Sequence, residues 1–349
     1  MDLTQFLIIL AQAGMLVNAM LIAAAYMVLA ERKIAAWIQN RVGPNRVGWW
    51  GMLQSFADVF KLYLKEDIVP AAADYKFHAL APVISIGVAI TVYAVIPWSG
   101  PFVTIDGISY GLAMAPNMNI GILTVLAMTS VGVYGIALAG WSSNNKYSLM
   151  GGLRASSQMI SYELSMGLAV IAVVMMSGSL NLLTIIQTQT QNGWNIFYQP
   201  LAFLIFFITA LAETNRAPFD LPEAEPELVG GYHTEYSGMK FGLLYLAEYA
   251  NILASSAIMA TLFLGGWDLI PFLDDSAILG LAPDSLIMVL LQHGAFVTKS
   301  CMLVFVFMWI RWSLPRFRYD QLMNLGWKVL LPLALANIAI TGIVLLLLN

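Results

Sequence analysis

Carboxylates and cations are concentrated in residues 213–237, where they could exchange protons. The acidic residues of this loop are Glu213, Asp220, Glu223, Glu225, Glu227 and Glu235, with Arg216 as their cation. Apolar residues such as Phe219 and Leu228 alternate with the acids, which favours a partly buried loop, although composition alone fits a solvated acidic loop equally well. Crowded, partly buried carboxylates have raised and coupled pKa values. The segment could therefore take up and release protons near neutral pH.

Two acids, Glu163 and Glu248, lie inside long apolar stretches. A carboxylate at the centre of a membrane helix costs about 2.5 kcal/mol or more, so such residues usually face a bundle interior or water and mark proton paths. The alternative is a protonated acid that forms a hydrogen bond with a neighbouring helix. Lys299 also lies in an apolar stretch, and it could pair with a carboxylate across the bundle.

Basic residues flank a rigid turn near residue 40. Arg32 and Arg41 lie on one side of the turn Gly43-Pro44-Asn45, and Arg46 follows it. Basic residues at the end of a membrane span commonly anchor it to lipid headgroups. The turn is more rigid than anchoring requires, so a docking surface or a cavity wall is the second interpretation.

The chain has few residues of the types that bind metals or iron–sulfur clusters. Cys301 is the single cysteine, and the three histidines, His78, His233 and His293, are not spaced as paired ligands. Iron–sulfur and structural zinc sites need several thiolates or imidazoles at short spacing. We therefore expect no metal and no redox cofactor in this chain.

The composition specifies the class of protein that positions these residues. Of the 349 residues, 60% are hydrophobic and 10% are charged, whereas a soluble domain has about 25% charged residues. This excludes a soluble globular protein and predicts an all-α polytopic membrane protein with a single domain, residues 1–349. The net charge of −4 argues against a nucleic-acid partner. The first apolar stretch lacks the basic region of a signal peptide and is expected to be a retained span.

Apolar windows of about 20 residues predict eight transmembrane helices. Their ranges are 3–30, 77–97, 117–140, 156–177, 199–212, 238–264, 285–310 and 328–348. The polar segment Ser177 to Tyr198 is expected to be a surface connection. Apolar residues at helical spacing predict an interfacial amphipathic helix over residues 49–65.

The basic residues predict the orientation of the chain. Of the 16 Lys and Arg, 15 lie in connections on one side of the predicted spans, and Lys299 is inside a span. Positive residues are enriched on the cytoplasmic side of membrane proteins. Both termini are therefore expected on the outer, periplasmic side, and the amphipathic helix and the acidic loop on the cytoplasmic side.

Long motifs resemble a known family. They are Glu31-Arg-Lys, Arg41-Val-Gly-Pro-Asn-Arg-Val-Gly, Gln54-Ser-Phe-Ala-Asp-Val-Phe-Lys, Gly140-Trp-Ser-Ser-Asn-Asn-Lys, Arg154-Ala-Ser-Ser-Gln-Met-Ile-Ser-Tyr-Glu163, Glu213-Thr-Asn-Arg-Ala-Pro-Phe-Asp-Leu-Pro-Glu and Trp309-Ile-Arg-Trp-Ser-Leu-Pro-Arg-Phe-Arg. Over its whole length the chain resembles the H-type membrane subunit of bacterial respiratory complex I, the NADH:quinone oxidoreductase.

The resemblance implies a multi-pass subunit of the bacterial inner membrane. With two peripheral-arm subunits it would form a chamber that admits quinone from the bilayer, beside neighbouring membrane subunits. NADH, FMN and the iron–sulfur clusters would bind to partner subunits, with quinone as the substrate. The alternatives are the homologous membrane anchor of a proton-pumping hydrogenase, or an autonomous ion carrier.

The resemblance also implies roles for individual residues. Arg32, Arg41 and Asp58 would lie near the chamber entrance. The acidic loop would face the chamber through Glu213, Arg216, Asp220, Glu223, Glu225 and Glu227. Glu163, Glu235 and Glu248 would begin a proton path. Some members have a further carboxylate in the third span, which this chain lacks, so polar residues such as Thr129, Ser130 and Tyr134, or water, would bridge that stretch.

Overall fold

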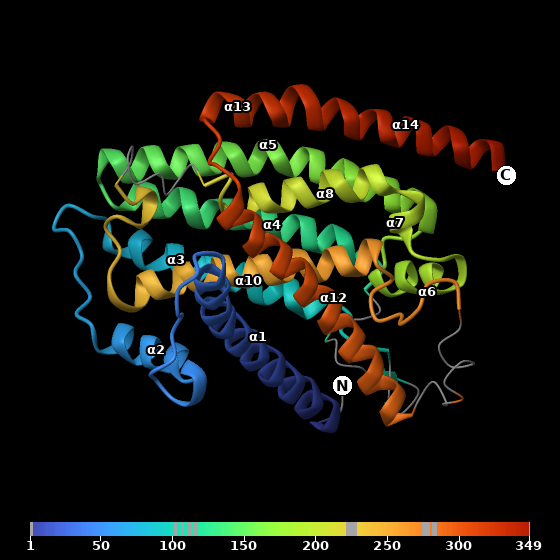
Figure 1. Ribbon diagram of the computed structural model, residues 1–349, viewed down its shortest axis with the longest axis horizontal. Helices are drawn as coiled ribbons and strands as arrows, with labels where there is room; N and C mark the ends of the chain where they lie inside the picture. The colour runs from blue at the N-terminus through green and yellow to red at the C-terminus, as the bar shows by residue number, and fades with distance from the viewer. Residues whose placement is uncertain are drawn as a thin grey trace.

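The computed structural model describes residues 3–100, 103–105, 108–110, 114, 118–220, 229–273, 280 and 285–348, and it is predominantly helical (Figure 1). The α-helices are α1 (Leu3–Ile38), α2 (Gln54–Leu64), α3 (Tyr75–Val95), α4 (Gly121–Ser142), α5 (Lys146–Ser177), α6 (Leu182–Asn192), α7 (Asn195–Tyr198), α8 (Pro200–Glu213), α10 (Gly238–Phe263), α12 (Leu286–Ser313), α13 (Tyr319–Asn324) and α14 (Leu331–Leu348). Short turns of other helix types are η1 (Trp49–Gly51), η2 (Gly231–His233) and the π-helical η3 (Leu325–Leu330). The strands β1 (Val103–Ile105) and β2 (Ile108–Tyr110) pair antiparallel, a small departure from the predicted all-α fold.

Within the described residues, seven helical segments are long and apolar enough to cross a membrane. They are Ile9–Ile38, Tyr75–Val95, Gly121–Ser142, Lys146–Ser177, Gly238–Phe263, Leu286–Ser313 and Tyr319–Leu348. These segments confirm a helix long enough to span a membrane at seven of the eight predicted spans. The remaining prediction, residues 199–212, corresponds to α8, which has 14 residues and is shorter than the roughly 20 that a hydrocarbon core requires. The count of eight spans and the orientation stay predictions.

The helices α3, α4, α5, α8 and α10 run side by side in a central bundle, which α1 and α12 cross obliquely (Figure 1). The helix α14 lies along α5 at the edge of the bundle, at the top of Figure 1. The helices α4 and α5 approach closely at Gly140 of α4. A Cβ built at this position would lie only 2.6 Å from the carbonyl oxygen of Ser148 in α5, so a larger residue would not fit. The centre of the core is α10, where Ala257, Ala260 and Phe263 have no exposed surface.

The predicted surface connection between residues 177 and 198 is wrong in part, because this segment forms α6 and α7. Ile185 and Ile186 of α6 are completely buried. The polar residues that suggested a loop satisfy backbone groups inside the protein. Gln189 donates to the carbonyl of Thr261 (2.8 Å) and accepts from the backbone N–H of Asn195 (3.2 Å) and Gly265 (3.0 Å). Such bonds remove the cost of burying polar groups.

Lys299 of α12 binds the end of α10. Its ammonium donates to the carbonyls of Leu264 (2.6 Å) and Gly266 (3.1 Å) and lies 4.1 Å from the centroid of the Trp194 ring. The last carbonyls of a helix have no partner in the helix and carry partial negative charge. A cation at this position therefore stabilises the end of α10.

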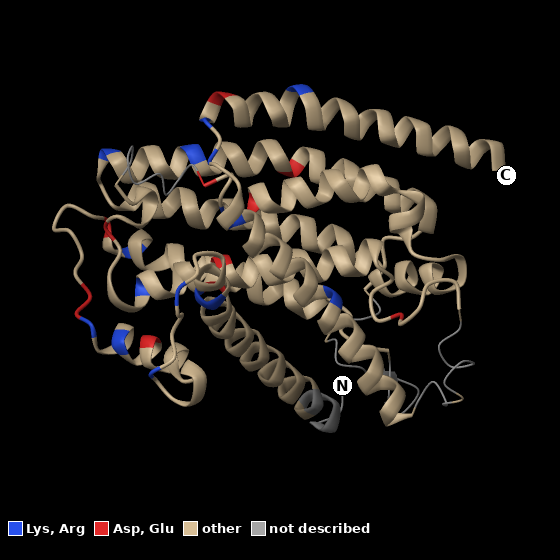
Figure 2. Cartoon of the chain, in the orientation of Figure 1, with Lys and Arg blue, Asp and Glu red and all other residues tan. Residues whose placement is uncertain are grey.

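The helix predicted over residues 49–65 is present as the shorter α2, with Trp49–Gly51 forming a separate turn before it, and its place at the membrane interface stays a prediction. Its apolar residues Phe60, Tyr63 and Leu64 are exposed, as expected for a helix on a membrane surface. Ser55 donates to the carbonyl of Ala25 (2.8 Å), which joins α2 to α1. Most Lys and Arg lie toward the end of the bundle that carries α2 and the beginnings of α3, α5 and α10 (Figure 2).

Candidate functional site

An ion pair between Arg216 and Glu248 lies at the centre of the site. Arg216 follows α8, Glu248 is in the middle of α10, and Arg216 Nη2 is 2.9 Å from Glu248 Oε2. The guanidinium lies over the rings of Tyr249 (4.4 Å) and Tyr245 (5.1 Å), which attract a cation through their π faces. Arg216 is only 3% exposed and Glu248 8%. The bundle therefore holds a charged pair out of water.

A second ion pair extends this centre into a chain of alternating charges. Glu31 of α1 pairs with Arg311 of α12, and Glu31 Oε2 is 4.0 Å from Arg216 Nη1. Two cations and two carboxylates thus alternate in the order Arg311, Glu31, Arg216, Glu248. Burial alone would lower the pKa of Arg216, but Glu248 and Glu31 hold this pKa well above its usual range. Arg216 therefore stays charged between the two carboxylates.

The turn η2 supplies two further groups to Glu248. The hydroxyl of Tyr232 donates to Glu248 Oε1 at 2.8 Å, and His233 Nε2 is 3.7 Å from the same oxygen. Both side chains are buried. The turn approaches the bundle closely because Gly151 of α5 lies beneath it, and a Cβ there would be 2.8 Å from Gly231 Cα. Close packing thus fixes the position of the Tyr232 hydroxyl.

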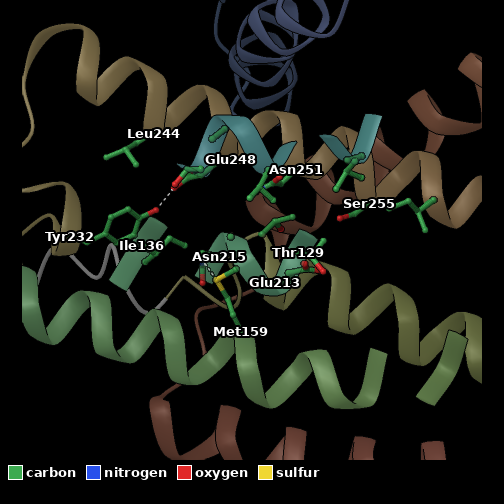
Figure 3. Close-up of a pocket in the computed structure, with 18 residues that line it drawn as sticks. Thr129, Ile136, Met159, Glu213, Asn215, Tyr232, Leu244, Glu248, Asn251 and Ser255 are labelled. Carbon is green, nitrogen blue, oxygen red and sulfur yellow. Dashed lines mark hydrogen bonds between the residues drawn. The ribbon is translucent and has the colours of Figure 1, made fainter. Parts of the chain in front are cut away.

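A small cavity with a mixed polar and apolar lining lies between Glu248 and Glu213, which is at the end of α8. It has a volume of about 40 Å³, and Thr129, Asn251 and Ser255 also line it. Figure 3 shows Glu213 beside Thr129, with the Tyr232–Glu248 hydrogen bond at a different part of the lining. A cavity of this size holds on the order of two or three waters when it has polar partners. Water here could carry a proton between the two acids.

Glu163 of α5 continues the line of acids. Ser130 of α4 donates to Glu163 Oε1, and Glu163 interacts electrostatically with Glu213. Thr129 lines the cavity and Ser130 contacts Glu163, whereas Tyr134 is 65% exposed. Glu213 is related to both of the other acids, because it interacts electrostatically with Glu163 and lines the same cavity as Glu248.

Other predicted residues lie in separate groups. Glu235 accepts from Asn145 (2.6 Å) rather than joining Glu248. Arg32 pairs with Asp58 at 2.6 Å where α1 meets α2, while the exposed Arg41 donates to Gln39. Asp220 is buried and pairs with Arg316 at 2.9 Å. Glu223, Glu225 and Glu227 lie outside the described residues. In the described part of the chain no group of three His, Cys, Asp or Glu could hold a metal.

Sequence reasoning missed Gln158, which positions the chain around Arg216. Gln158 of α5 is fully buried, and its amide nitrogen donates to the carbonyls of Ala212 (2.7 Å) and Phe219 (2.8 Å). Ala212 precedes Arg216 in the sequence and Phe219 follows it. The available signal was a polar residue facing inward from an apolar helix, but its partners, more than 50 residues away, are not visible in the sequence.

Gln158→Leu is expected to destabilise the site, because it leaves the buried carbonyl of Phe219 without its donor and removes one of the donors to the carbonyl of Ala212. An unsatisfied buried polar group costs about 1–3 kcal/mol. We expect a lower thermal-inactivation temperature in membranes, and Gln187→Leu, at an exposed position of α6, provides the control. Equal thermal stability of the two variants would contradict the role given to Gln158.

The fold and the site together define a multi-pass membrane protein with a buried chain of ion pairs between its helices. A family model described as NADH dehydrogenase matches residues 11–342, so the chain belongs to the NADH dehydrogenase family.

Several relatives match this chain along nearly their whole length. The chain is 52% identical to NADH-quinone oxidoreductase subunit 8 of Rhodothermus marinus over 338 residues, 95% of each chain. It is 51% identical to an H-type NADH-quinone oxidoreductase subunit of Cytophaga hutchinsonii, covering 94% of this chain and 93% of that protein. It is also 51% identical to an H-type NADH-quinone oxidoreductase subunit of Geobacter sulfurreducens, covering 93% and 91%.

Proposed function

We propose that this chain is the membrane subunit of a bacterial, proton-translocating NADH:quinone oxidoreductase and couples quinone reduction to proton movement. The names of relatives that match it almost end to end support the enzyme. NADH, FMN and iron–sulfur clusters would bind to partner subunits, and two peripheral-arm subunits would dock on the cytoplasmic face. The termini would lie on the periplasmic side of the inner membrane, with eight spans if the short α8 crosses together with its flanking residues.

The quinone chamber would adjoin α2 and the loop 213–237. The Arg32–Asp58 pair joins α1 to the amphipathic helix, whose exposed apolar face suits a quinone that enters from lipid. Arg41 would lie at the entrance, and Asp220 with the loop acids Glu223, Glu225 and Glu227 would face the headgroup. Reduction of a quinone to quinol consumes two protons, which nearby acids can supply.

The observation that carries the coupling is the water-sized cavity between Glu213 and Glu248. Arg216 pairs with Glu248 at 2.9 Å and lies 4.0 Å from Glu31. Protonation of Glu248 would weaken the first pair and leave the guanidinium to Glu31, because attraction between charges falls with distance and with loss of charge. When the quinone takes up protons during its reduction, the protonation of Glu248 would therefore change, and this change would affect the charges of Glu213 and Glu163. Glu235, with Asn145, would form a second proton inlet.

The combined Glu163→Gln and Glu248→Gln variant of the assembled complex tests this proposal. Proton transfer by a positioned side chain contributes at least about 100-fold to a rate, so we expect quinone reduction and proton pumping to fall together by about that factor. Glu66→Gln, at an exposed position, is the control and should leave both unchanged. If the double variant kept both activities at wild-type levels, the coupling proposal would be wrong.

A further inference from the structure

A second and larger cavity lies between α1, α3, α10 and α12. Its volume is about 370 Å³, and its wall is mainly apolar, with Met15, Leu16 and Met20 from α1 and Leu253 from α10. The two oblique helices α1 and α12 flank it (Figure 1). Met15 is 64% exposed on a membrane-spanning helix. Molecules dissolved in the bilayer can therefore reach this cavity, which shares no lining residue with the Glu213–Glu248 cavity.

The cavity has the size of a ligand site rather than of a packing defect. Native cores contain few voids larger than a water molecule. An apolar cavity of about 150 Å³ suffices to bind benzene, and sites for larger ligands begin near 300 Å³. A wall of this kind excludes ordered water, which needs polar partners. The occupant must therefore be mostly apolar.

Ser300 of α12 gives this apolar wall an unused hydrogen-bond donor. It lines the cavity and is 2% exposed, and its hydroxyl makes no hydrogen bond with any residue that the structure describes. Hydroxyl groups in membrane helices usually bond to the carbonyl four residues earlier. Thr298 donates to Gly294 (2.7 Å) and Ser256 donates to Ile252 (2.8 Å) in this way. A buried polar group without a partner costs about 1–3 kcal/mol, so a ligand that supplies an acceptor gains from it.

Tyr93 and Trp98, two aromatic residues that line the cavity, already use their polar atoms. The Tyr93 hydroxyl donates to the carbonyl of Ala250 (2.9 Å), and Trp98 Nε1 donates to the carbonyl of Tyr93 (3.3 Å). His293 Nδ1 is 3.2 Å from the carbonyl of Trp98 and must donate, because a carbonyl only accepts. The Tyr93 and Trp98 rings therefore offer flat apolar surface to a ligand, while Ser300 offers a donor.

We propose that this cavity binds a lipid-soluble molecule with a long apolar body and a carbonyl oxygen that accepts a hydrogen bond from Ser300. Two sources in a bacterial membrane have this chemistry, a quinone with an apolar tail and the acyl ester of a lipid. The proposal does not rest on the proposed function, since it concerns a different cavity and needs no redox chemistry.

Cys301 makes the proposal testable. It is the single cysteine of the chain, it is exposed, and it lines the same cavity. In the assembled complex, its alkylation by a small neutral maleimide can be followed by mass spectrometry of the peptide that contains it. One arm adds a decyl-tailed benzoquinone whose ring positions are all substituted, so that the thiol cannot add to it. The other arm adds methyl oleate.

We expect at least one of the two compounds to slow alkylation of Cys301 in a saturable way. Protection by the quinone alone identifies the quinone source, protection by the ester alone identifies the acyl source, and protection by both supports the shared carbonyl chemistry. Ser300→Ala should raise the half-protecting concentration about fivefold, as expected for a hydrogen bond worth about 1 kcal/mol. Ser256→Ala, whose hydroxyl lies outside the cavity and is bonded within its own helix, should not change it.

A variant that fills the cavity gives an independent measurement. Ala19→Phe places a ring in the lining of the cavity from α1, and this variant should remove the protection by either compound. Proposed binding is overturned if neither compound slows alkylation of the wild-type chain, or if Ser300→Ala leaves the half-protecting concentration unchanged. Because the readout is alkylation, this result is independent of quinone reduction and proton pumping.

Discussion

Arg216→Met is expected to prevent most of the complex from assembling. The substitution removes the cation that Glu248 and Glu31 share, so Glu31 keeps Arg311 while Glu248 stays buried without its arginine. Removing one partner of a buried ion pair typically costs about 3–5 kcal/mol, while the total stability of a folded domain is only about 5–15 kcal/mol. The measurement is the amount of assembled complex in isolated membranes, together with the half-life of its activity on heating.

Three further variants separate loss of charge from loss of a side chain. Arg32→Gln breaks an ion pair in which Arg32 is 47% exposed, and exposed pairs contribute at most about 1 kcal/mol, so assembly should persist. Arg216→Lys keeps the charge but loses the planar group over Tyr249, so its assembly should be intermediate. Adding Glu248→Gln to Arg216→Met removes the buried negative charge that Arg216 no longer balances and should recover part of the assembly. If Arg216→Met assembled as well as Arg32→Gln, the buried ion-pair chain would not be what stabilises the site.

The spans could be predicted because their signals are local. A window of about 20 apolar residues has few alternatives to a membrane helix, so residues 77–97 were predicted and Tyr75–Val95 is observed. The ends are less certain, because charged or polar residues can continue a helix beyond the apolar window. The helix α5 begins at Lys146, ten residues before the predicted start at 156. In these first turns Gly152 packs against Gly140 of α4 and Gly151 against Gly231 of η2.

The arrangement of the site could not be predicted in the same way, because it depends on contacts between distant segments. Glu31 and Arg311 are 280 residues apart, and each alone resembles an anchoring charge at the end of a span. Glu235 and Tyr232 are three residues apart, yet the turn sends Tyr232 to Glu248 and Glu235 to Asn145. The acids themselves were recognisable from their cost in an apolar helix. The partner of each acid was not.

Gly151→Ala is expected to damage proton coupling without touching any charged residue. A Cβ at Gly151 would lie 2.8 Å from Gly231 Cα and 2.9 Å from the backbone nitrogen of Tyr232, so η2 must move outward. Overpacking of this kind costs about 1–3 kcal/mol. The movement would lengthen the 2.8 Å bond from the Tyr232 hydroxyl to Glu248. Because a displacement of about 1 Å can cost 100-fold in rate, we expect proton pumping and quinone reduction to fall at least tenfold.

The same helix offers a matched control. A Cβ at Gly167 would meet nothing within 4 Å, and alanine favours a helix over glycine by about 1 kcal/mol, so Gly167→Ala should be as active and as stable as wild type or better. Tyr232→Phe removes the hydroxyl without moving the turn. If η2 acts by positioning that hydroxyl, Gly151→Ala and Tyr232→Phe should lose pumping to a similar extent, while only Gly151→Ala also loses thermal stability. A Gly151→Ala variant that matched Gly167→Ala in both measurements would show that close packing beneath η2 does not position the Tyr232 hydroxyl for proton coupling.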